Sequence, residues 1–70
     1  MGTVQSVDRA LDLLNEVGRE AGGLVDLAGR VGLATSTAAR LLATLEHRGA
    51  VRRGDDGFYE IGALIQGMTA

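Results

Sequence analysis

Apolar residues recur at helical spacing in three short segments of the chain, and a glycine follows each segment closely. The three stripes are Val7, Ala10, Leu11, Leu14 and Val17, then Val25, Leu27, Ala28 and Val31, then Ala38, Leu41, Leu42 and Leu45. Residues three and four apart lie on one face of a helix. The spacing therefore predicts three short amphipathic helices that share one core.

Capping signals place the ends of the first helix at about residues 6 and 18. Ser6 is a favourable N-cap, and Asp8 in the first turn complements the positive end of the helix dipole. Gly18 is expected to end the helix. Leu13 lies off the main apolar stripe and is expected to widen the apolar surface.

Glycines also set the ends of the next two helices. Gly32 follows the second stripe as a left-handed C-terminal residue, and Leu33 is expected to turn back into the core. The third helix covers about 35–48 and ends at Gly49, with His47 and Arg48 in its last turn. About four residues that include a glycine join these two helices, which predicts a helix-turn-helix over about 24–48.

The period of the sequence changes after Gly49. Two short runs suited to β-strands, 50–53 and 58–61, flank the turn sequence Gly-Asp-Asp-Gly at 54–57. This pattern predicts a β-hairpin, here the wing of the domain at about 50–62. Apolar residues at 63–65 and 68 predict the start of a fourth helix. The expected fold is mainly α with a small β-hairpin, a winged helix-turn-helix domain over 1–62.

The size and composition of the chain exclude several classes of protein. The chain has 70 residues, enough for one small domain. Phe58 and Tyr59 are its only aromatic residues, so the core is expected to be built from leucine, valine, isoleucine and alanine. It has no cysteine, which removes disulfides and thiolate metal sites. No apolar run approaches the roughly 20 residues of a membrane span, and nothing at the start reads as a signal peptide. We expect a cytoplasmic protein.

Positive charge is concentrated in one part of the chain, although the net charge is −2. Residues 34–53 carry four arginines against one glutamate, a local charge of +3. The residues before this segment carry −2, and those after it carry −3. A local basic patch is the electrostatic footprint of a site for a polyanion.

The face of the third helix opposite its apolar stripe consists of small and polar side chains with one arginine. The candidate DNA-contacting residues on it are Thr35, Ser36, Thr37, Ala39, Arg40 and Thr44. Hydroxyl groups can bind phosphate, alanines permit close approach, and Arg40 can reach a guanine or a phosphate. The alternative is that the hydroxyl residues only cap the helix and that Arg40 is merely solvated.

Two arginines on the first strand of the hairpin, Arg52 and Arg53, are further candidates for phosphate contact. Alternation along a strand points them to opposite faces, so one is expected to reach DNA while the other pairs with an acid such as Glu60. Asp55 and Asp56 would repel a phosphate, and turn formation explains them well.

Nothing in the chain indicates an enzyme or a metal site. His47 is the only histidine, and no cysteine or carboxylate cluster accompanies it. No candidate nucleophile has a residue near it in the sequence that could act as its general base. We expect neither catalysis nor a bound cofactor.

The first helix carries more apolar side chains than one inward stripe requires. A surplus apolar strip indicates either a partner surface or contact with the fourth helix. Val7, Leu11 and Leu14 are the candidates for a dimer interface.

The chain resembles the N-terminal domain of IclR-type bacterial transcription regulators. The matching segments are VQSVDRALDLL at 4–14, LAGRVGL at 27–33, STAARLLATLEHRGAVRR at 36–53 and YEIG at 59–62. The family often has proline where this chain has Ala34, and serine or threonine where it has Val25.

This resemblance implies a winged helix-turn-helix that binds operator DNA as a homodimer, with the third helix in the major groove and the first helix contributing to pairing. It places the usual DNA-facing positions on Thr35, Ser36, Thr37, Ala39 and Arg40. It also implies that 63–70 begin a linker helix toward a C-terminal domain that binds a small-molecule effector and is absent here. A different class remains open: a winged-helix module that binds proteins, favoured by the acidic wing tip and the net charge of −2.

Overall fold

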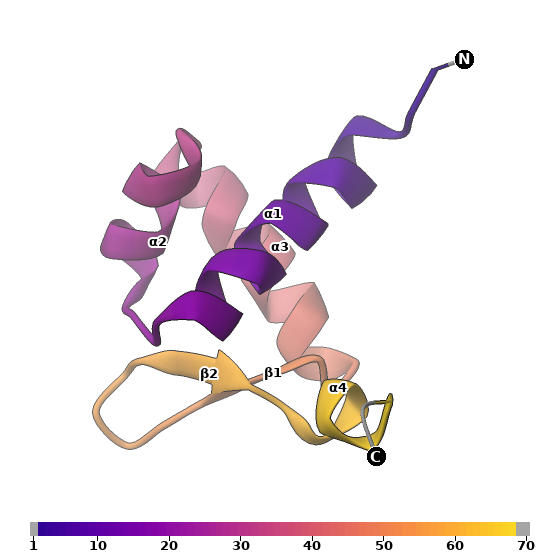
Figure 1. Ribbon diagram of the computed structural model, residues 1–70. Helices are drawn as coiled ribbons and strands as arrows, with labels where there is room; N and C mark the ends of the chain where they lie inside the picture. The colour runs from indigo at the N-terminus through magenta and orange to yellow at the C-terminus, as the bar shows by residue number, and fades with distance from the viewer. Residues whose placement is uncertain (1, 69–70) are drawn as a thin grey trace.

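A computed structural model describes residues 2–68 and contains three packed helices with a β-hairpin at one end (Figure 1). The elements, in chain order, are α1 (Gln5–Arg19), α2 (Leu24–Val31), α3 (Thr35–His47), β1 (Val51–Arg53), β2 (Tyr59–Ile61) and α4 (Ala63–Met68). This order confirms the expected mainly helical fold with a wing.

The core lies where the three long helices and the hairpin meet. Its buried side chains come in pairs, Leu13 and Val17 from α1, Leu27 and Ala28 from α2, Ala38 and Leu42 from α3, and Val51 and Tyr59 from the hairpin. Tyr59 is only 6% exposed, so an aromatic ring joins the aliphatic core that the composition predicted. The hairpin is therefore part of the hydrophobic core and not an appendage.

The inward face of α1 differs from the prediction. Leu13 is fully buried, whereas Val7 and Leu11 are 54% and 56% exposed. Leu13 and Val17 are one helical turn apart and point to the position where both α2 and α3 pack. The predicted stripe was therefore rotated, because periodicity alone does not show which apolar residues meet two neighbouring helices.

The ends of α1 also differ from the prediction. The N-cap is Val4, which has no capping side chain, so Ser6 is not the cap but lies in the first turn. The helix continues through Gly18 to Arg19. Arg30 of α2 donates hydrogen bonds to two carbonyl oxygens at the end of α1, those of Glu20, at 2.8 Å, and Glu16, at 3.5 Å. The Glu16 oxygen also accepts the backbone N–H of Glu20, at 3.0 Å.

Arg30 also forms an ion pair with Asp26 one turn earlier in α2. The hydrogen bond that Arg30 donates to the Asp26 carboxylate raises the pKa of the Arg30 guanidinium above its ordinary value. The side chain thus joins α2 to the C-terminal end of α1, where positive charge is favourable.

The link between α2 and α3 is a tight turn of three residues, 32–34, one fewer than predicted. Gly32 has a φ of 70°, the left-handed conformation expected of it. Leu33 donates its backbone N–H to Ala28 O at 2.9 Å and packs against the core, as predicted.

Val25 does not belong to the apolar face of α2, contrary to the prediction. It is 73% exposed, and Leu24 lies on the inward face in its place, with Leu27, Ala28 and Val31. Positions 24, 27, 28 and 31 form a more regular helical stripe than the predicted set.

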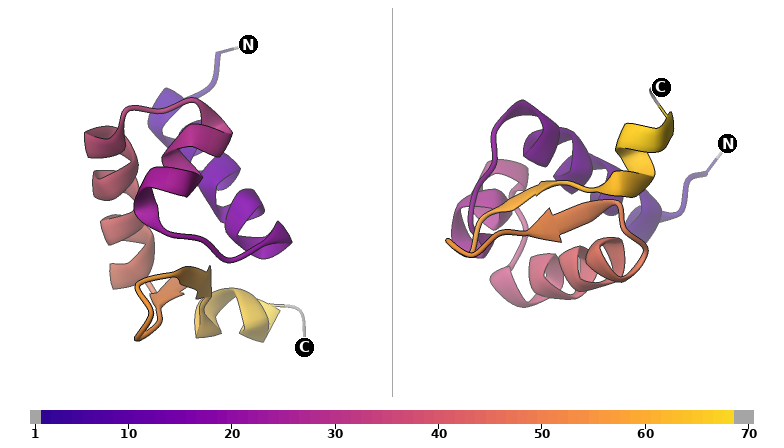
Figure 2. Two further views of the ribbon diagram at one scale, coloured as in Figure 1. Left: turned by 90° about the vertical axis from the view of Figure 1, so that its left-hand side faces the viewer. Right: turned by 90° about the horizontal axis from the view of Figure 1, so that it is seen from below.

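The wing is an antiparallel pair in which Val51, Arg52 and Arg53 face Ile61, Glu60 and Tyr59 respectively. Its loop spans 54–58, because Phe58 lies before β2 and not within it. Gly57 has a φ of 83°, and the Phe58 N–H donates to Asp56 Oδ1 at 2.9 Å. The link between α1 and α2 runs beside β2, where Tyr59 N donates to Gly22 O at 2.8 Å (Figure 2).

A close contact between two glycines fixes the start of α4. A Cβ atom at Gly62 would lie 2.3 Å from the carbonyl oxygen of Gly49, so only glycine fits there. The same carbonyl accepts a hydrogen bond from Leu64 N at 3.0 Å. The end of α3 and the beginning of α4 are thereby held together beside β1.

Candidate nucleic-acid interface

One face of α3 packs into the core and the other is open to solvent. Ala38 and Leu42 are fully buried, with Leu41 and Leu45 half-buried beside them, as the apolar stripe predicted. The exposed positions include Thr35, Ser36, Thr37, Arg40, Ala43 and Thr44, and Ala39 is half-buried. The helix lies at one side of the molecule, and no other element crosses its outer face (Figure 2).

The hydroxyl groups at the start of α3 do not cap it. The N-cap is Ala34, and no side-chain cap is formed. Within residues 2–68, Thr35, Ser36 and Thr37 make no side-chain hydrogen bond. The simple alternative, that these hydroxyls serve only as caps, is therefore wrong, and they stay available to a ligand. Thr44 differs, because its hydroxyl donates to Arg40 O at 3.1 Å.

Arg40 carries the positive charge of this face. Three other arginines have carboxylate partners, namely Arg19 with Glu16, Arg30 with Asp26 and Arg52 with Glu60. In the part of the chain that the structure describes, Arg40 has neither an ion pair nor a side-chain hydrogen bond. Its guanidinium therefore keeps its full capacity for an anion.

A shallow notch separates this face from the first turn of α1. It has a volume of about 270 Å³ and is lined by Ser6, Thr37, Arg40, Leu41 and Thr44. The sequence predicts only a capping role for Ser6 and gives no sign that this residue lines a notch with α3. The signal was not available in the sequence, because the notch arises from the packing of α1 against α3, whose residues are about 30 positions apart.

The two arginines of β1 point to opposite faces of the wing, as predicted. Arg52 forms an ion pair with Glu60 on the facing strand. Arg53 instead lies over the Tyr59 ring, with its guanidinium carbon 5.5 Å from the ring centroid, and donates to Gly57 O at 3.4 Å. Arg53 is thus the wing arginine whose charge no carboxylate neutralises within residues 2–68.

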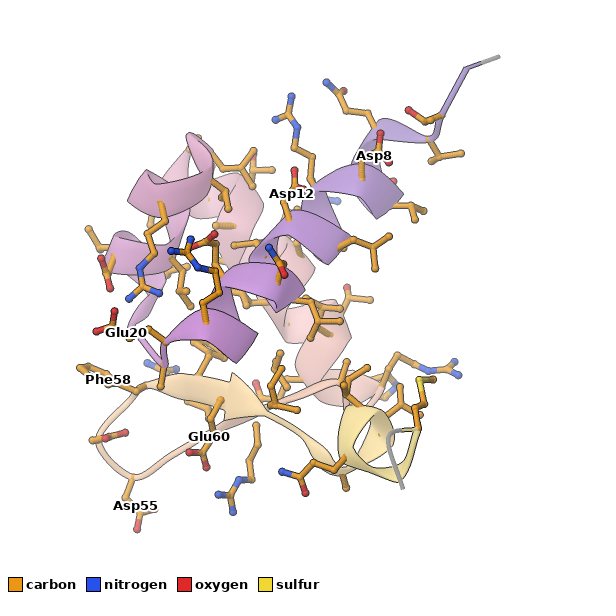
Figure 3. The ribbon with its side chains drawn as sticks, viewed as in Figure 1. Asp8, Asp12, Glu20, Asp55, Phe58 and Glu60 are labelled. Atoms are coloured by element: carbon orange, nitrogen blue, oxygen red, sulfur yellow. The ribbon has the colours of Figure 1, made fainter. Side chains whose placement is uncertain are left out.

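The acidic residues of the wing serve its turn and its outer surface. Asp56 accepts the Phe58 N–H inside the loop, and Asp55 projects from the outer end of the loop (Figure 3). Glu60 lies on the side of the hairpin away from the three long helices (Figure 3). The tip itself is unsuited to approach a phosphate.

The outer face of α1 is apolar and open. Val4, Val7 and Leu11 are more than half exposed, and Leu14 is half-buried. Leu11 and Leu14 also line a groove with Ile61 and Ile65, so α4 takes up part of the surplus apolar surface. Val7 and Leu11 nevertheless remain exposed among the described residues, as a partner surface requires.

Other kinds of site are not found in residues 2–68. No group of three histidine, cysteine or acidic side chains there could hold a metal ion. None of the helices described is long and apolar enough to cross a membrane.

An exposed helix of small and polar side chains, preceded by a tight turn and followed by a wing, defines the winged helix-turn-helix class. The sequence profile of the IclR helix-turn-helix domain matches residues 6–55. The chain therefore belongs to the IclR family, whose members are DNA-binding regulators of transcription and not enzymes.

Several named relatives support this assignment. The chain is 43% identical to the transcriptional repressor IclR of Escherichia coli (strain K12) over 65 residues, which are 89% of this chain and 24% of that protein. It is 42% identical to the acetate operon repressor of Salmonella typhimurium, again over 89% of this chain and 24% of that protein. It is 40% identical to the HTH-type transcriptional regulator Rv1719 of Mycobacterium tuberculosis, over 97% of this chain and 27% of that one.

Solved structures agree with this fold. An IclR transcriptional regulator from Alicyclobacillus acidocaldarius has a crystal structure that superposes on this chain with a TM-score of 0.90 at 27% identity. The match covers 96% of this chain and 28% of the regulator. The crystal structure of Pseudomonas aeruginosa HmgR superposes with a TM-score of 0.81 at 28% identity, and the match covers 94% of this chain and 29% of HmgR. The chain spans about a quarter of the length of the curated relatives that it matches.

Proposed function

We propose that this domain reads operator DNA by inserting α3 into the major groove. The observation that carries the proposal is the outer face of α3, where three hydroxyls and Arg40 lie together without a hydrogen-bond or ion-pair partner among residues 2–68. A major groove about 12 Å wide accepts a helix about 10–12 Å across. The small side chains on this face permit that close approach.

Each residue of the face has a distinct contribution in this proposal. Thr35, Ser36 and Thr37 donate hydroxyl hydrogen bonds at the start of the helix, to phosphate or to base edges. Ala39 contacts a thymine methyl group, and Arg40 reaches either a guanine or a phosphate. Thr44 lies at the edge of the contact, because its hydroxyl already donates to the backbone.

The wing contributes through Arg53 more than through Arg52. Arg52 must leave Glu60 before it can bind a phosphate, whereas Arg53 has no carboxylate partner in the part of the chain that the structure describes. The acidic loop at 54–57 then lies off the DNA backbone.

We propose further that two copies bind one operator through Val7, Leu11 and Leu14 of α1. The exposed apolar face of that helix supports pairing. A symmetric pair would read two half-sites about 34–36 Å apart, or a multiple of this distance.

The place of this chain in a larger regulator is a proposal of the same kind. In this proposal residues 1–62 form the DNA-binding domain, and 63–70 begin a linker toward an effector-binding domain that senses a small molecule; of this linker the structure describes α4, and positions 69 and 70 lie outside the described residues. The named relatives, two of which are repressors, are about four times as long as the segment they share with this chain. Such a regulator acts in the cytoplasm, where bacterial DNA lies.

Selection of binding sites from a random duplex pool tests this function. The expected product is a site with two-fold symmetry, bound with an affinity that falls steeply as salt increases. Failure to bind any duplex at low salt would instead support a domain that binds proteins, for which the acidic wing tip is the observation.

A further inference from the structure

The notch between α1 and α3 offers a second anchoring point for DNA outside the helix-turn-helix. Its wall consists of Ser6 from α1 and of Thr37, Arg40, Leu41 and Thr44 from α3. Two elements thus bring hydroxyl groups and one guanidinium to the same depression. We propose that this notch holds one phosphate of the DNA backbone, with Ser6 and Arg40 as its ligands. This inference rests on the proposed DNA binding and extends it.

The chemistry of the notch suits a phosphate. Arg40 supplies a planar set of N–H donors that matches phosphate oxygens, and its guanidinium has no carboxylate partner in residues 2–68. The hydroxyls of Ser6 and Thr37 have no hydrogen-bond partner in the same residues and can each donate to a second oxygen. None of the five lining residues is acidic.

The nearest acid along the chain does not oppose this arrangement. Asp8, one turn after the beginning of α1, does not line the notch, and its carboxylate accepts a hydrogen bond from Thr3 Oγ1 at 2.6 Å. Figure 3 shows Asp8 beside the N-terminal segment at the outer end of α1.

Position within the groove favours a phosphate over a base. A helix that fills the major groove presents the middle of its outer face to base edges and its flanks to the phosphates on either side. The notch lies on the flank of α3 that adjoins α1. A ligand shared by α1 and α3 is therefore the backbone strand at that edge of the groove.

The test uses the 70-residue chain and an operator duplex selected from a random pool. Ser6→Ala should bind this duplex three- to tenfold more weakly, and Ser6→Asp, which brings a negative charge beside Arg40, at least thirtyfold more weakly. Asn15→Asp is the control, because it adds the same charge on α1 away from the notch. Thermal unfolding of each variant checks that the fold is kept, as expected for an exposed residue such as Ser6.

Neutral methylphosphonate substitutions then locate the contact. One substitution should weaken binding by the parent chain more than it weakens binding by Ser6→Ala, because the variant has already lost one of the two ligands of that phosphate and keeps only Arg40. If every substitution weakens both proteins equally, or if Ser6→Asp binds like the parent, the inference is wrong while DNA binding by α3 stands. If the parent chain binds no duplex, the proposed function fails and this inference with it.

Discussion

At the scale of single residues, ion pairs reduce the number of arginines that are available to an anion. Arg19, Arg30 and Arg52 are held by carboxylates, whereas Arg9, Arg40, Arg48 and Arg53 have no carboxylate partner within residues 2–68. Of these four, Arg40 lies on the outer face of α3 and Arg53 lies on the wing. The sequence shows only seven arginines and a basic segment, and it cannot show which charges are already neutralised. The register of the hairpin supplies that information, since it sets Arg52 directly opposite Glu60.

The two wing arginines provide a matched comparison. Arg53→Ala should lower DNA affinity about threefold to tenfold and reduce the salt dependence, because each phosphate contact contributes about 0.9 to the slope of log affinity against log salt. Arg52→Ala should change affinity less than twofold, because Glu60 already neutralises this residue. Fluorescence anisotropy over a series of salt concentrations measures both, and a larger loss for Arg52→Ala would contradict the assignment.

At the scale of elements, the turn before α3 controls how firmly the recognition helix is anchored. The chain enters α3 through Gly32, which is left-handed, and Ala34, the N-cap, which has no capping side chain. Ala34 has φ −60° and ψ 142°, which is the backbone that proline prefers. Proline, which the family often has at this position, therefore fits the φ and ψ angles that Ala34 already adopts.

Ala34→Pro should therefore stabilise the domain. The N–H of Ala34 donates no backbone hydrogen bond among the described residues, so its loss costs nothing there. Reduced entropy of the unfolded chain should add about 0.4–1 kcal/mol to the free energy of unfolding, and raise Tm by a few degrees. Ala34→Gly should have the opposite effect. A lower Tm for the proline variant, measured by circular dichroism, would show that the turn is strained by the ring.

Much of this element structure follows from sequence. The three helices, Gly32 and the inward stripe of α3 are predicted because helical periodicity is strong and a glycine lies near each helix end, although α1 continues past Gly18 to Arg19. The roles of Leu13 and Ser6 are not, since they depend on how helices pack against each other and not on the spacing within one helix. The burial of Tyr59 depends likewise on pairing between β2 and the distant Gly22.

At the scale of the whole molecule, two exposed faces are available for the two proposed contacts. The outer face of α3 is polar and carries Arg40, while the outer face of α1 is apolar through Val4, Val7 and Leu11. Leu11 lines a groove with Ile61 and Ile65, so α4 takes up part of this second face, and Val7 stays exposed on the rest of it. Two copies joined through it would present two recognition helices to one operator.

Leu11→Asn should therefore weaken pairing without unfolding the domain, since Leu11 is 56% exposed. Binding to a duplex with two half-sites should fall at least tenfold, about 1.4 kcal/mol, while binding to one half-site is kept. Val25→Asn is the control, because Val25 is equally apolar and 73% exposed but lies on α2. Sedimentation of the protein–DNA complex gives the stoichiometry, and two copies on the duplex for both variants with unchanged affinity would exclude α1 as the interface.

The central claim, that the outer face of α3 binds DNA, is tested most directly by comparing Arg40→Ala with Arg19→Ala. Each variant removes one positive charge, but Arg19 lies at the end of α1 and pairs with Glu16. Salt-dependent binding to the selected operator duplex is the measurement. Arg40→Ala should weaken binding, whereas Arg19→Ala should change affinity less than twofold. A loss of about 1–3 kcal/mol that depends on the base sequence indicates a base contact by Arg40, and a uniform loss with a salt slope smaller by about 1 indicates a phosphate contact. Equal affinities and equal slopes for the two variants would contradict the central claim.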